Sequence, residues 1–426
     1  MYRTMVTYPR RVNCILSAGR NWMQHRWIAP SQHCFYFKGI LQHHWETMNI
    51  IHGQWGDGRM KTYVLSHFSA LHWLLSHQDP RVGNNAPYLD VPASSDAPDS
   101  QVVEELRWTI GLEGPLDFLV IGDGALRRSS AVRPHRCSQD IPPGSLIPIA
   151  CRAHDAEMLV CCPELAFLQI CQAVDTLAAI YFGMCVCSDF RFDSFALGGV
   201  VFRSEGGHAI ASQNSIARYL DRSDGLKGAK RARLALRHVR DHARSPKECA
   251  LGMMFCLPAR LGGFDLGDPS FNEMVRVFDG SDRRGNPRYS IRYPDIAIRS
   301  TSRKGERRMV FVDYDPASTH AGMEKMMLDS RRRNDMATIR DVPHFTITSD
   351  DAMSFEYLEK LADRMRRLLG RRSRPLLRGA KDSAESREVL LRTQERRRLL
   401  WLQFIARSFD SVLADYACAN LANAHM

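Results

Sequence analysis

Four carboxylates in the second half of the chain have the types and spacing of a metal site. Asp295 lies within a predicted strand, and Asp313 and Asp315 end the next one, on one face because residues two apart in a strand share a face. Glu248 lies in an upstream predicted helix from which it could reach the same point. Carboxylates on rigid strands can hold Mg²⁺ or Mn²⁺, which activates water for phosphodiester hydrolysis. Acids at ordinary turns and strand ends would give the same pattern.

The elements that must position these acids follow one another between residues 225 and 370. Periodicity and turn residues predict helices at 225–244 and 245–257, strands at 273–278, 289–298 and 309–315, a helix at 322–340, a strand at 344–348 and a helix at 354–369. After the first helix the order is helix, three strands, helix, strand, helix. The predicted fold class is therefore α/β, in an α+β arrangement with an upstream mixed α/β domain.

Basic residues recur at helical spacing in the predicted helix 225–244, one position after a row of apolar residues. The cationic row consists of Lys230, Arg233, Arg237, Arg240 and Arg244. The connection 299–308 adds five basic residues in ten, among them Arg303, Lys304 and Arg307. Such clusters are typical of contacts with nucleic-acid phosphates, although the helical row also fits a solvated surface face.

Several short motifs in this region form one continuous series. They are Gly228-Ala229-Lys230-Arg231-Ala232-Arg233, Ser245-Pro246-Lys247-Glu248, Pro294-Asp295, Val312-Asp313-Tyr314-Asp315, His320 and Asp329-Ser330-Arg331-Arg332-Arg333-Asn334. The series, over about residues 225–350, resembles a bacterial family of unknown function related to the very-short-patch-repair endonucleases. The element order resembles the PD-(D/E)XK core of restriction-endonuclease-like proteins.

The resemblance implies a role for each matching residue. Asp295 would be the principal metal ligand, Asp313 the second acid and Glu248 the acid of the helix. His320 would assist water or the leaving group, and Asp315 stands where the motif has a lysine. Lys325, a basic group from the next predicted helix, would replace that lysine. Supporting or DNA-contacting roles would fall to Asp329, Arg332 and Arg333.

The upstream part, residues 61–224, carries its own alternation of elements. Helices are predicted at 66–76 and 164–182, strands at 116–121, 146–150 and 157–162, and a basic stretch at 127–136. The motif Ser66-His67-Phe68-Ser69-Ala70-Leu71 and these elements are similar to antitoxins of abortive-infection toxin–antitoxin pairs. That similarity implies a cognate toxin protein as a partner.

Bulk properties bound the remaining possibilities. The chain has 426 residues, more than a single hydrophobic core usually organises. Its net charge of +11 favours polyanionic partners, DNA first. The twelve cysteines show no Cys-x-x-Cys spacing and are predicted to be core residues. No apolar run is long enough to cross a membrane, so a cytoplasmic protein is predicted. Residues 1–60 are predicted to be a poorly ordered basic segment, and 371–426 an Arg/Glu/Leu-rich helical tail with a helix near 383–415.

Two functions remain open at this stage, and a protein–protein scaffold, indicated only by the C-terminal Arg/Glu/Leu helix, is a weaker third. The first is a Mg²⁺-dependent DNA endonuclease of a defence, repair or mobile-element system. The second is a DNA-binding antitoxin or transcriptional regulator without catalysis. The absent motif lysine and the short acid Asp313 weaken the first, whereas the basic clusters serve both.

Overall fold

The computed structural model describes most of the chain after residue 60. The described residues are 61–77, 91–110, 114–149, 156–193, 195–196, 199–203, 209–302, 304–316, 342–371 and 383–423. They form a mixed α/β structure, which confirms the predicted class at this level, and residues 60–426 make up one unit. The predicted segment 1–60 and the predicted helix 322–340 lie outside the described residues.

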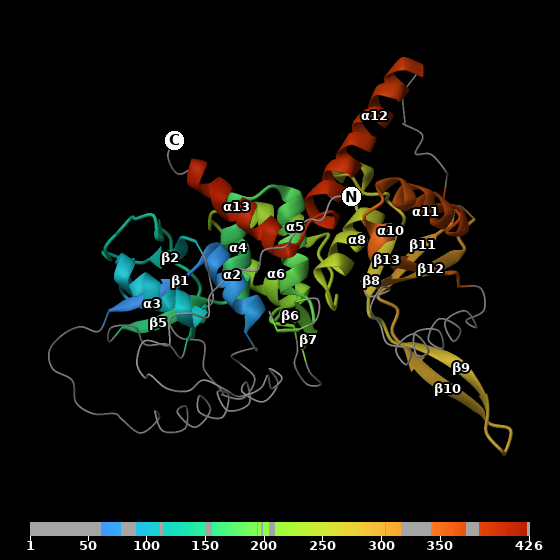
Figure 1. The fold of residues 1–426 in the computed structure, drawn as a ribbon, viewed down its shortest axis with the longest axis horizontal. Coiled ribbons are helices and arrows are strands. Elements are labelled where there is room, and N and C mark those ends of the chain that lie inside the picture. The colour runs from blue at the N-terminus through green and yellow to red at the C-terminus, as the bar shows by residue number, and fades with distance from the viewer. Residues whose placement is uncertain are drawn as a thin grey trace, which may run out of the picture. The chain divides into compact units, whose positions relative to one another are not determined.

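A five-stranded sheet organises the first part of this unit (Figure 1). Its order is β3-β2-β1-β5-β4, in which β1 pairs antiparallel with β2 and parallel with β5. The bounds are β1 Thr62–Leu65, β2 Leu116–Val120, β3 Val132–Arg136, β4 Leu146–Pro148 and β5 Glu157–Cys161. All five residues of β2 are buried. The predicted strands at 116–121, 146–150 and 157–162 are confirmed, and β1 and β3 were not foreseen.

Helices pack beside this sheet and supply most of the apolar core. They are α2 His67–Ser76, α3 Ser100–Ile110, α4 Pro163–Ala173, α5 Thr176–Val186 and α6 Gln213–Asp221, with a small ribbon of β6 Phe190–Phe192 and β7 Val200–Phe202. The prediction of one helix over 164–182 is wrong. Val174 is extended, and Asp175 caps the second helix by accepting a hydrogen bond from the Ala178 N–H at 2.9 Å.

The predicted helix 225–244 is also much shorter in the structure. Helix α7 covers only Ala229–Leu236. Beyond it His242 adopts φ 72°, and its N–H donates to the Cys187 carbonyl at 3.0 Å. The apolar residues Val239 and Ala243 are still buried, but as part of this irregular segment. Helix α7 packs against α4, α5 and α6, so the predicted boundary at residue 225 falls within a continuous core.

A four-stranded sheet carries the candidate acids. Its order is β13-β12-β11-β8, with antiparallel pairing of β8, β11 and β12 and parallel pairing of β12 with β13. The bounds are α8 Pro246–Cys256, β8 Asp268–Phe271, β11 Ile296–Thr301, β12 Arg307–Asp315, β13 His344–Thr348, α10 Ser349–Ala352 and α11 Phe355–Leu368. The predictions for α8, β12, β13 and α11 are confirmed, whereas β8 was missed.

The predicted strand 289–298 is in fact two strands in different sheets. β10, Pro287–Arg292, pairs only with β9, Val275–Ser281, in a two-stranded hairpin that extends from the four-stranded sheet (Figure 1). The strand is interrupted at residues 293–295, and β11 begins after them. Pro294 lacks an N–H and cannot continue a ladder, which accounts for the break.

The C-terminal helices join the two sheet-containing parts. They are α12 Ser383–Leu400, a π-helical turn at Trp401–Ile405, and α13 Phe409–Asn423. Lys247 of α8 donates to the Arg407 carbonyl at 3.1 Å, and the Tyr416 hydroxyl donates to Asp175 at 2.7 Å. Phe409 packs against Phe182 and Phe192. Among the described residues, none of the helices is long and apolar enough to cross a lipid bilayer.

Candidate functional site

Asp295 and Asp313 lie side by side at one end of the four-stranded sheet. The register places Ile296 opposite Val312, so Asp295, just before β11, falls opposite Asp313 of β12. Each carboxylate accepts a hydrogen bond from the other strand. Asp313 Oδ1 accepts from the Asp295 N–H at 3.0 Å, and Asp295 Oδ2 accepts from the Tyr314 N–H at 2.7 Å. This reciprocal clasp fixes both side chains on one face.

His344 provides a further contact to this pair. It begins β13, which runs parallel to β12, and its Nε2 lies 3.1 Å from Asp313 Oδ2. The side chains of His344 and Asp313 are 8% and 12% exposed. The sequence prediction did not single out His344, and its only signal was a His at the start of a strand expected next to Asp313.

Glu248 of α8 is held by a separate set of donors. Its carboxylate, which is buried, accepts from the Arg244 N–H at 2.9 Å, the Ser245 hydroxyl at 2.9 Å and the Asn272 amide at 3.0 Å. Burial raises the pKa of Glu248, and these hydrogen bonds partly oppose the rise. The Asn272 N–H in turn donates to the Asp295 carbonyl at 3.2 Å. Glu248 therefore orders the bend that carries Asp295.

Asp315 lies two residues beyond Asp313 on β12, opposite Thr348 of β13. It occupies the place where the resemblance calls for lysine. Lys247, the lysine of α8, donates hydrogen bonds to the backbone carbonyls of Ile405 and Arg407. Its ammonium group is therefore already bonded to the C-terminal segment. The predicted His320, Lys325, Asp329, Arg332 and Arg333 lie outside the described residues.

The acid pair offers the donor type that Mg²⁺ prefers, and a small number of ligands. One or two carboxylates, with water and substrate phosphate for the rest, are a usual Mg²⁺ set in proteins. Over the described part of the chain, no group of three or more His, Cys, Asp or Glu side chains is gathered as a metal site. Among the described residues, Asp295 and Asp313 are therefore the acids that could ligate an ion at this place.

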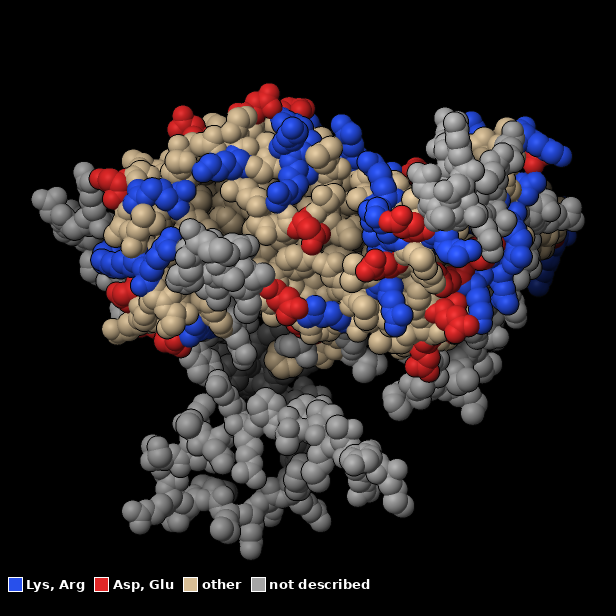
Figure 2. Space-filling view, turned by 90° about the horizontal axis from the view of Figure 1, so that it is seen from above, with Lys and Arg blue, Asp and Glu red and all other residues tan. Residues whose placement is uncertain are grey.

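The predicted cationic row does not form one stripe, because α7 ends before Arg237. Arg233 forms an ion pair with Asp224 and donates to the Leu220 carbonyl at 2.6 Å. Arg240 pairs with Asp268 at 2.6 Å, and Arg244 stacks over the Phe202 and Tyr293 rings. Lys230 and Arg237 are exposed. On the face seen in Figure 2, basic side chains are interspersed with acidic ones.

The basic connection between β11 and β12 is a hairpin, as predicted, and is partly neutralised. Lys304 and Arg307 are exposed, whereas Arg308 pairs with Glu306 at 2.8 Å. Arg299 forms an ion pair with Glu273. Arg303 lies outside the described residues.

The β9–β10 hairpin carries a basic and aromatic surface that the sequence prediction missed. Phe278, Tyr289 and Ile291 are 56%, 51% and 49% exposed, and Phe278 pairs directly with Tyr289. Exposed arginines lie along the hairpin and at its tip: Arg276, Arg283, Arg284 and Arg288. Arg276 lies over the Tyr289 ring at 5.1 Å. The available signal was the alternation of Arg with apolar residues on either side of a Gly-Asn turn.

The tip and the base of this hairpin are both fixed. At the tip, Asp282 accepts hydrogen bonds from the N–H groups of Arg284 and Asn286, each at 2.8 Å. At the base, Val277 is buried in a small cluster with Ala297 and Phe311 of the four-stranded sheet. β10 continues through Tyr293 and Pro294 into Asp295, which joins the hairpin covalently to the acid pair.

In comparisons with protein-family models, curated proteins and solved structures, nothing matched this chain.

Proposed function

We propose that residues 246–369 form a restriction-endonuclease-like domain that hydrolyses phosphodiester bonds in DNA with Mg²⁺. The observation that carries this proposal is the reciprocal clasp of Asp295 and Asp313 on neighbouring strands. The element order supports it: α8, then β8, β11 and β12 of one sheet, then β13 and α11. This is the order of the PD-(D/E)XK resemblance, with β8 as its first strand and the β9–β10 hairpin inserted after it.

Each residue of the site would have a different role. A bound Mg²⁺ would supply activated water and charge neutralisation. Asp295 and Asp313 would hold the ion, because their carboxylates share one face and are kept there by backbone N–H groups. His344, 3.1 Å from Asp313, would keep that carboxylate oriented. Glu248 would act indirectly, since three donors already occupy it.

The β9–β10 hairpin would bring DNA to this site. Strands of six and seven residues span about 20 Å, and a two-stranded ribbon fits the major groove of B-DNA. Its four exposed arginines suit phosphate contacts. The exposed Phe278, Tyr289 and Ile291 give it an apolar face for base edges. Since β10 leads directly into Asp295, a duplex on the hairpin would lie near the acids.

A regulator that binds DNA without cutting it is the second candidate function. It is favoured by the carboxylate contacts, since Asp295 and Asp313 already accept backbone N–H groups and Asp313 Oδ2 also lies 3.1 Å from His344 Nε2. Asp315 in the lysine position also favours it. The antitoxin resemblance of residues 61–224 would then point to repression of its own operon or binding of a toxin.

Plasmid nicking in Mg²⁺ or Mn²⁺ separates the two candidates. The wild-type chain should convert supercoiled plasmid to open circles, and Asp295→Asn should not, because the metal ligand is lost while the side-chain shape is kept. Asp350→Asn, at an exposed acid of α10, is the matched control and should cut normally. Equal cutting by all three proteins would show that another site, or a contaminant, is responsible. No cutting by wild type together with tight DNA binding would leave the regulator.

DNA binding by the hairpin is tested by neutralising its tip. The triple variant Arg283→Ala/Arg284→Ala/Arg288→Ala should bind duplex DNA more weakly and lower the salt slope of log K by about 3, near one per phosphate contact. The matched control is Arg387→Ala/Arg396→Ala/Arg398→Ala, three exposed arginines of α12. If the control loses as much affinity as the hairpin variant, binding follows net charge and not the hairpin.

A further inference from the structure

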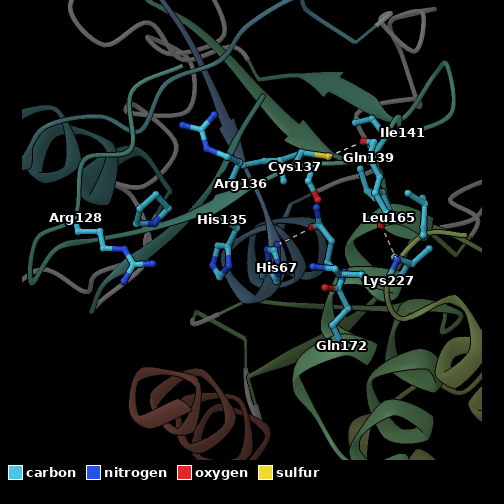
Figure 3. A pocket seen from close by; sticks show the side chains of 16 residues that line it. His67, Arg128, His135, Arg136, Cys137, Gln139, Ile141, Leu165, Gln172 and Lys227 are labelled. Carbon is cyan, nitrogen blue, oxygen red and sulfur yellow. Dashed lines mark hydrogen bonds between the residues drawn. The ribbon is translucent and has the colours of Figure 1, made fainter. Parts of the chain in front are cut away.

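A pocket in the first part of the unit has a lining unlike that of the acid site. Its volume is about 310 Å³, and it lies between the end of β3, the start of α2, and α4 (Figure 3). The polar and charged residues of its wall are His67, Arg128, His135, Arg136, Ser138, Gln139, Gln169, Gln172 and Lys227. None of the described lining residues is acidic. This volume is at the lower end for small-ligand pockets, so a polymer would not fit inside.

The floor of the pocket is a chain of buried polar groups. The rings of His67 and His135 stack at 3.7 Å, and His135 Nε2 lies 2.8 Å from Asp117 Oδ1. Asp117 is almost fully buried and also accepts from Arg133 Nη2 at 3.0 Å. The buried amide of Gln169 accepts the His67 N–H at 3.0 Å. These contacts fix both imidazole rings in the wall of the pocket.

His67 is held in a conformation that needs this support. Its φ is 47°, in the left-handed region that residues with a Cβ rarely adopt. Burial lowers the pKa of His67 well below its usual value, with His135 and Arg133 adding to the effect, so the ring is neutral near pH 7. Strained backbone kept in place by surrounding contacts is concentrated at binding sites.

Cations stand on opposite sides of the histidine pair. Figure 3 shows Arg128 on one side and Lys227 on the other, with His135 and His67 between them. Both cations are exposed, and within the described residues neither forms an ion pair. The guanidinium of Arg136 donates to the carbonyls of Gly122 and Gly124, at 2.6 and 3.0 Å. Three positive charges therefore border the pocket, and no acidic residue is among its described lining residues.

The segment that carries Lys227 is built into the wall. The Lys227 N–H donates to Gln139 Oε1 at 3.0 Å, and Gln139 Nε2 donates to the Gly225 carbonyl at 2.6 Å. The next residue, Gly228, has φ +91°, and a Cβ there would meet the Leu168 carbonyl at 2.7 Å. Lys227 is thus placed at the rim by a close approach to α4, which only glycine permits at position 228.

We propose that this pocket binds the phosphate group of a small molecule. A phosphate monoester carries close to two negative charges near pH 7 and three acceptor oxygens, which matches several convergent donors. The basic side chains at the rim, Arg128, Arg136 and Lys227, would supply the positive charge that attracts the phosphate. The amides of Gln139 and Gln172 and the imidazole of His135 would contact the rest of the ligand. This site is independent of the acid pair, so the proposal does not rest on the proposed function.

Calorimetry on the full chain tests the proposal with inorganic phosphate and a nucleoside monophosphate as probes. Tighter binding of the monophosphate would identify an organic phosphate ligand, and equal binding would identify free phosphate. Arg128→Ala and Lys227→Ala should each raise Kd roughly ten-fold, the usual effect of removing one charge-assisted hydrogen bond. Arg127→Ala and Lys230→Ala, exposed neighbours that do not line the pocket, should change Kd by about two-fold or less.

Two results would overturn the proposal. One is the absence of binding by either probe at millimolar concentration in a folded wild-type chain. The other is a duplex oligonucleotide that displaces the probe and is itself weakened by Arg128→Ala, since the pocket rim would then belong to a DNA surface. Asp295→Asn should leave probe binding unchanged, so failure here and failure of the nuclease proposal are distinguishable.

Discussion

Two clusters, one in each of the two larger sheets, contain aspartates with different partners. Asp117 of β2 meets a cation, since Arg133 Nη2 lies 3.0 Å from its Oδ2, and His135 and Ser69 complete its shell. Asp295 and Asp313 instead accept from each other's backbone, with His344 beside them. The first cluster balances its charge internally. The second places two like charges opposite each other on one face, where a bound cation would offset their repulsion.

The comparison teaches that burial of an acid does not by itself indicate function. Asp117 is as deeply buried as any acid in the described chain, and its contacts account for its charge. What distinguishes Asp295 and Asp313 is the placing of two like charges on one face, which costs free energy unless a cation or proton offsets it. Four measurements test this difference between the two clusters.

The largest effect is expected at the cluster of Asp117, Arg133, His135 and Ser69, called the balanced cluster below. Asp117→Asn removes the charge that Arg133 and His135 face, and should lower the free energy of unfolding by about 3–5 kcal/mol. Denaturant unfolding of the wild-type and variant chains measures it. Asp295→Asn should cost much less. Equal losses in the two variants would mean that both clusters are structural in the same sense.

A smaller effect is expected when Mg²⁺ is added. An ion that binds only the folded chain stabilises it by about 1.4 kcal/mol at ten times its Kd. Thermal unfolding should therefore shift upward with Mg²⁺ for wild type and for Asp117→Glu, but not for Asp313→Asn. A shift that persists in Asp313→Asn would place the ion elsewhere.

The third measurement concerns Glu248, a buried acid held by hydrogen bonds. Its pKa is raised above the usual 4.5 by burial. A raised pKa contributes stability that is fully present below the unfolded value and is lost as pH rises through the folded value. The stability of wild type relative to Glu248→Gln should therefore fall as pH rises from below 4.5, measured by urea unfolding across the range. A difference that rises with pH would mean that the hydrogen bonds outweigh burial.

The smallest effect is expected at His344. His344→Gln removes the imidazole whose Nε2 lies 3.1 Å from Asp313 Oδ2, and should cost about 1 kcal/mol, the usual cost of a single substitution. His135→Gln, which removes a partner of Asp117, is the matched change in the balanced cluster. If His344→Gln costs as much as Asp117→Asn, the second cluster is as tightly balanced as the first.

Local patterns predicted much of the second sheet and its acids. β12, β13, α8 and α11 follow from alternation, a serine cap and helical spacing, and Asp295 and Asp313 were placed on neighbouring strands. The failures came where tertiary contacts override local preference. Helix α7 stops because the backbone at His242 bonds to Cys187, and the strand at 289–298 divides at Pro294.

The balanced cluster could not have been predicted in the same way. β2 reads as an apolar strand in which Asp117 is a single exception, and its partners Ser69 and Arg133 are distant in sequence. Nothing in their spacing indicates that they meet. The clasp of Asp295 and Asp313 is different, because one antiparallel register relates both residues and could be anticipated from strand order.

The contacts of α13 have a consequence for how the chain acquires its structure during synthesis. Tyr416 bonds to Asp175, the Ala417 carbonyl accepts from Arg133, and the turn just before α13 accepts from Lys247. These C-terminal residues leave the ribosome after both regions that they join. The two sheets can therefore form in order of synthesis, whereas their connection through α13 has to wait until residues beyond 416 have emerged.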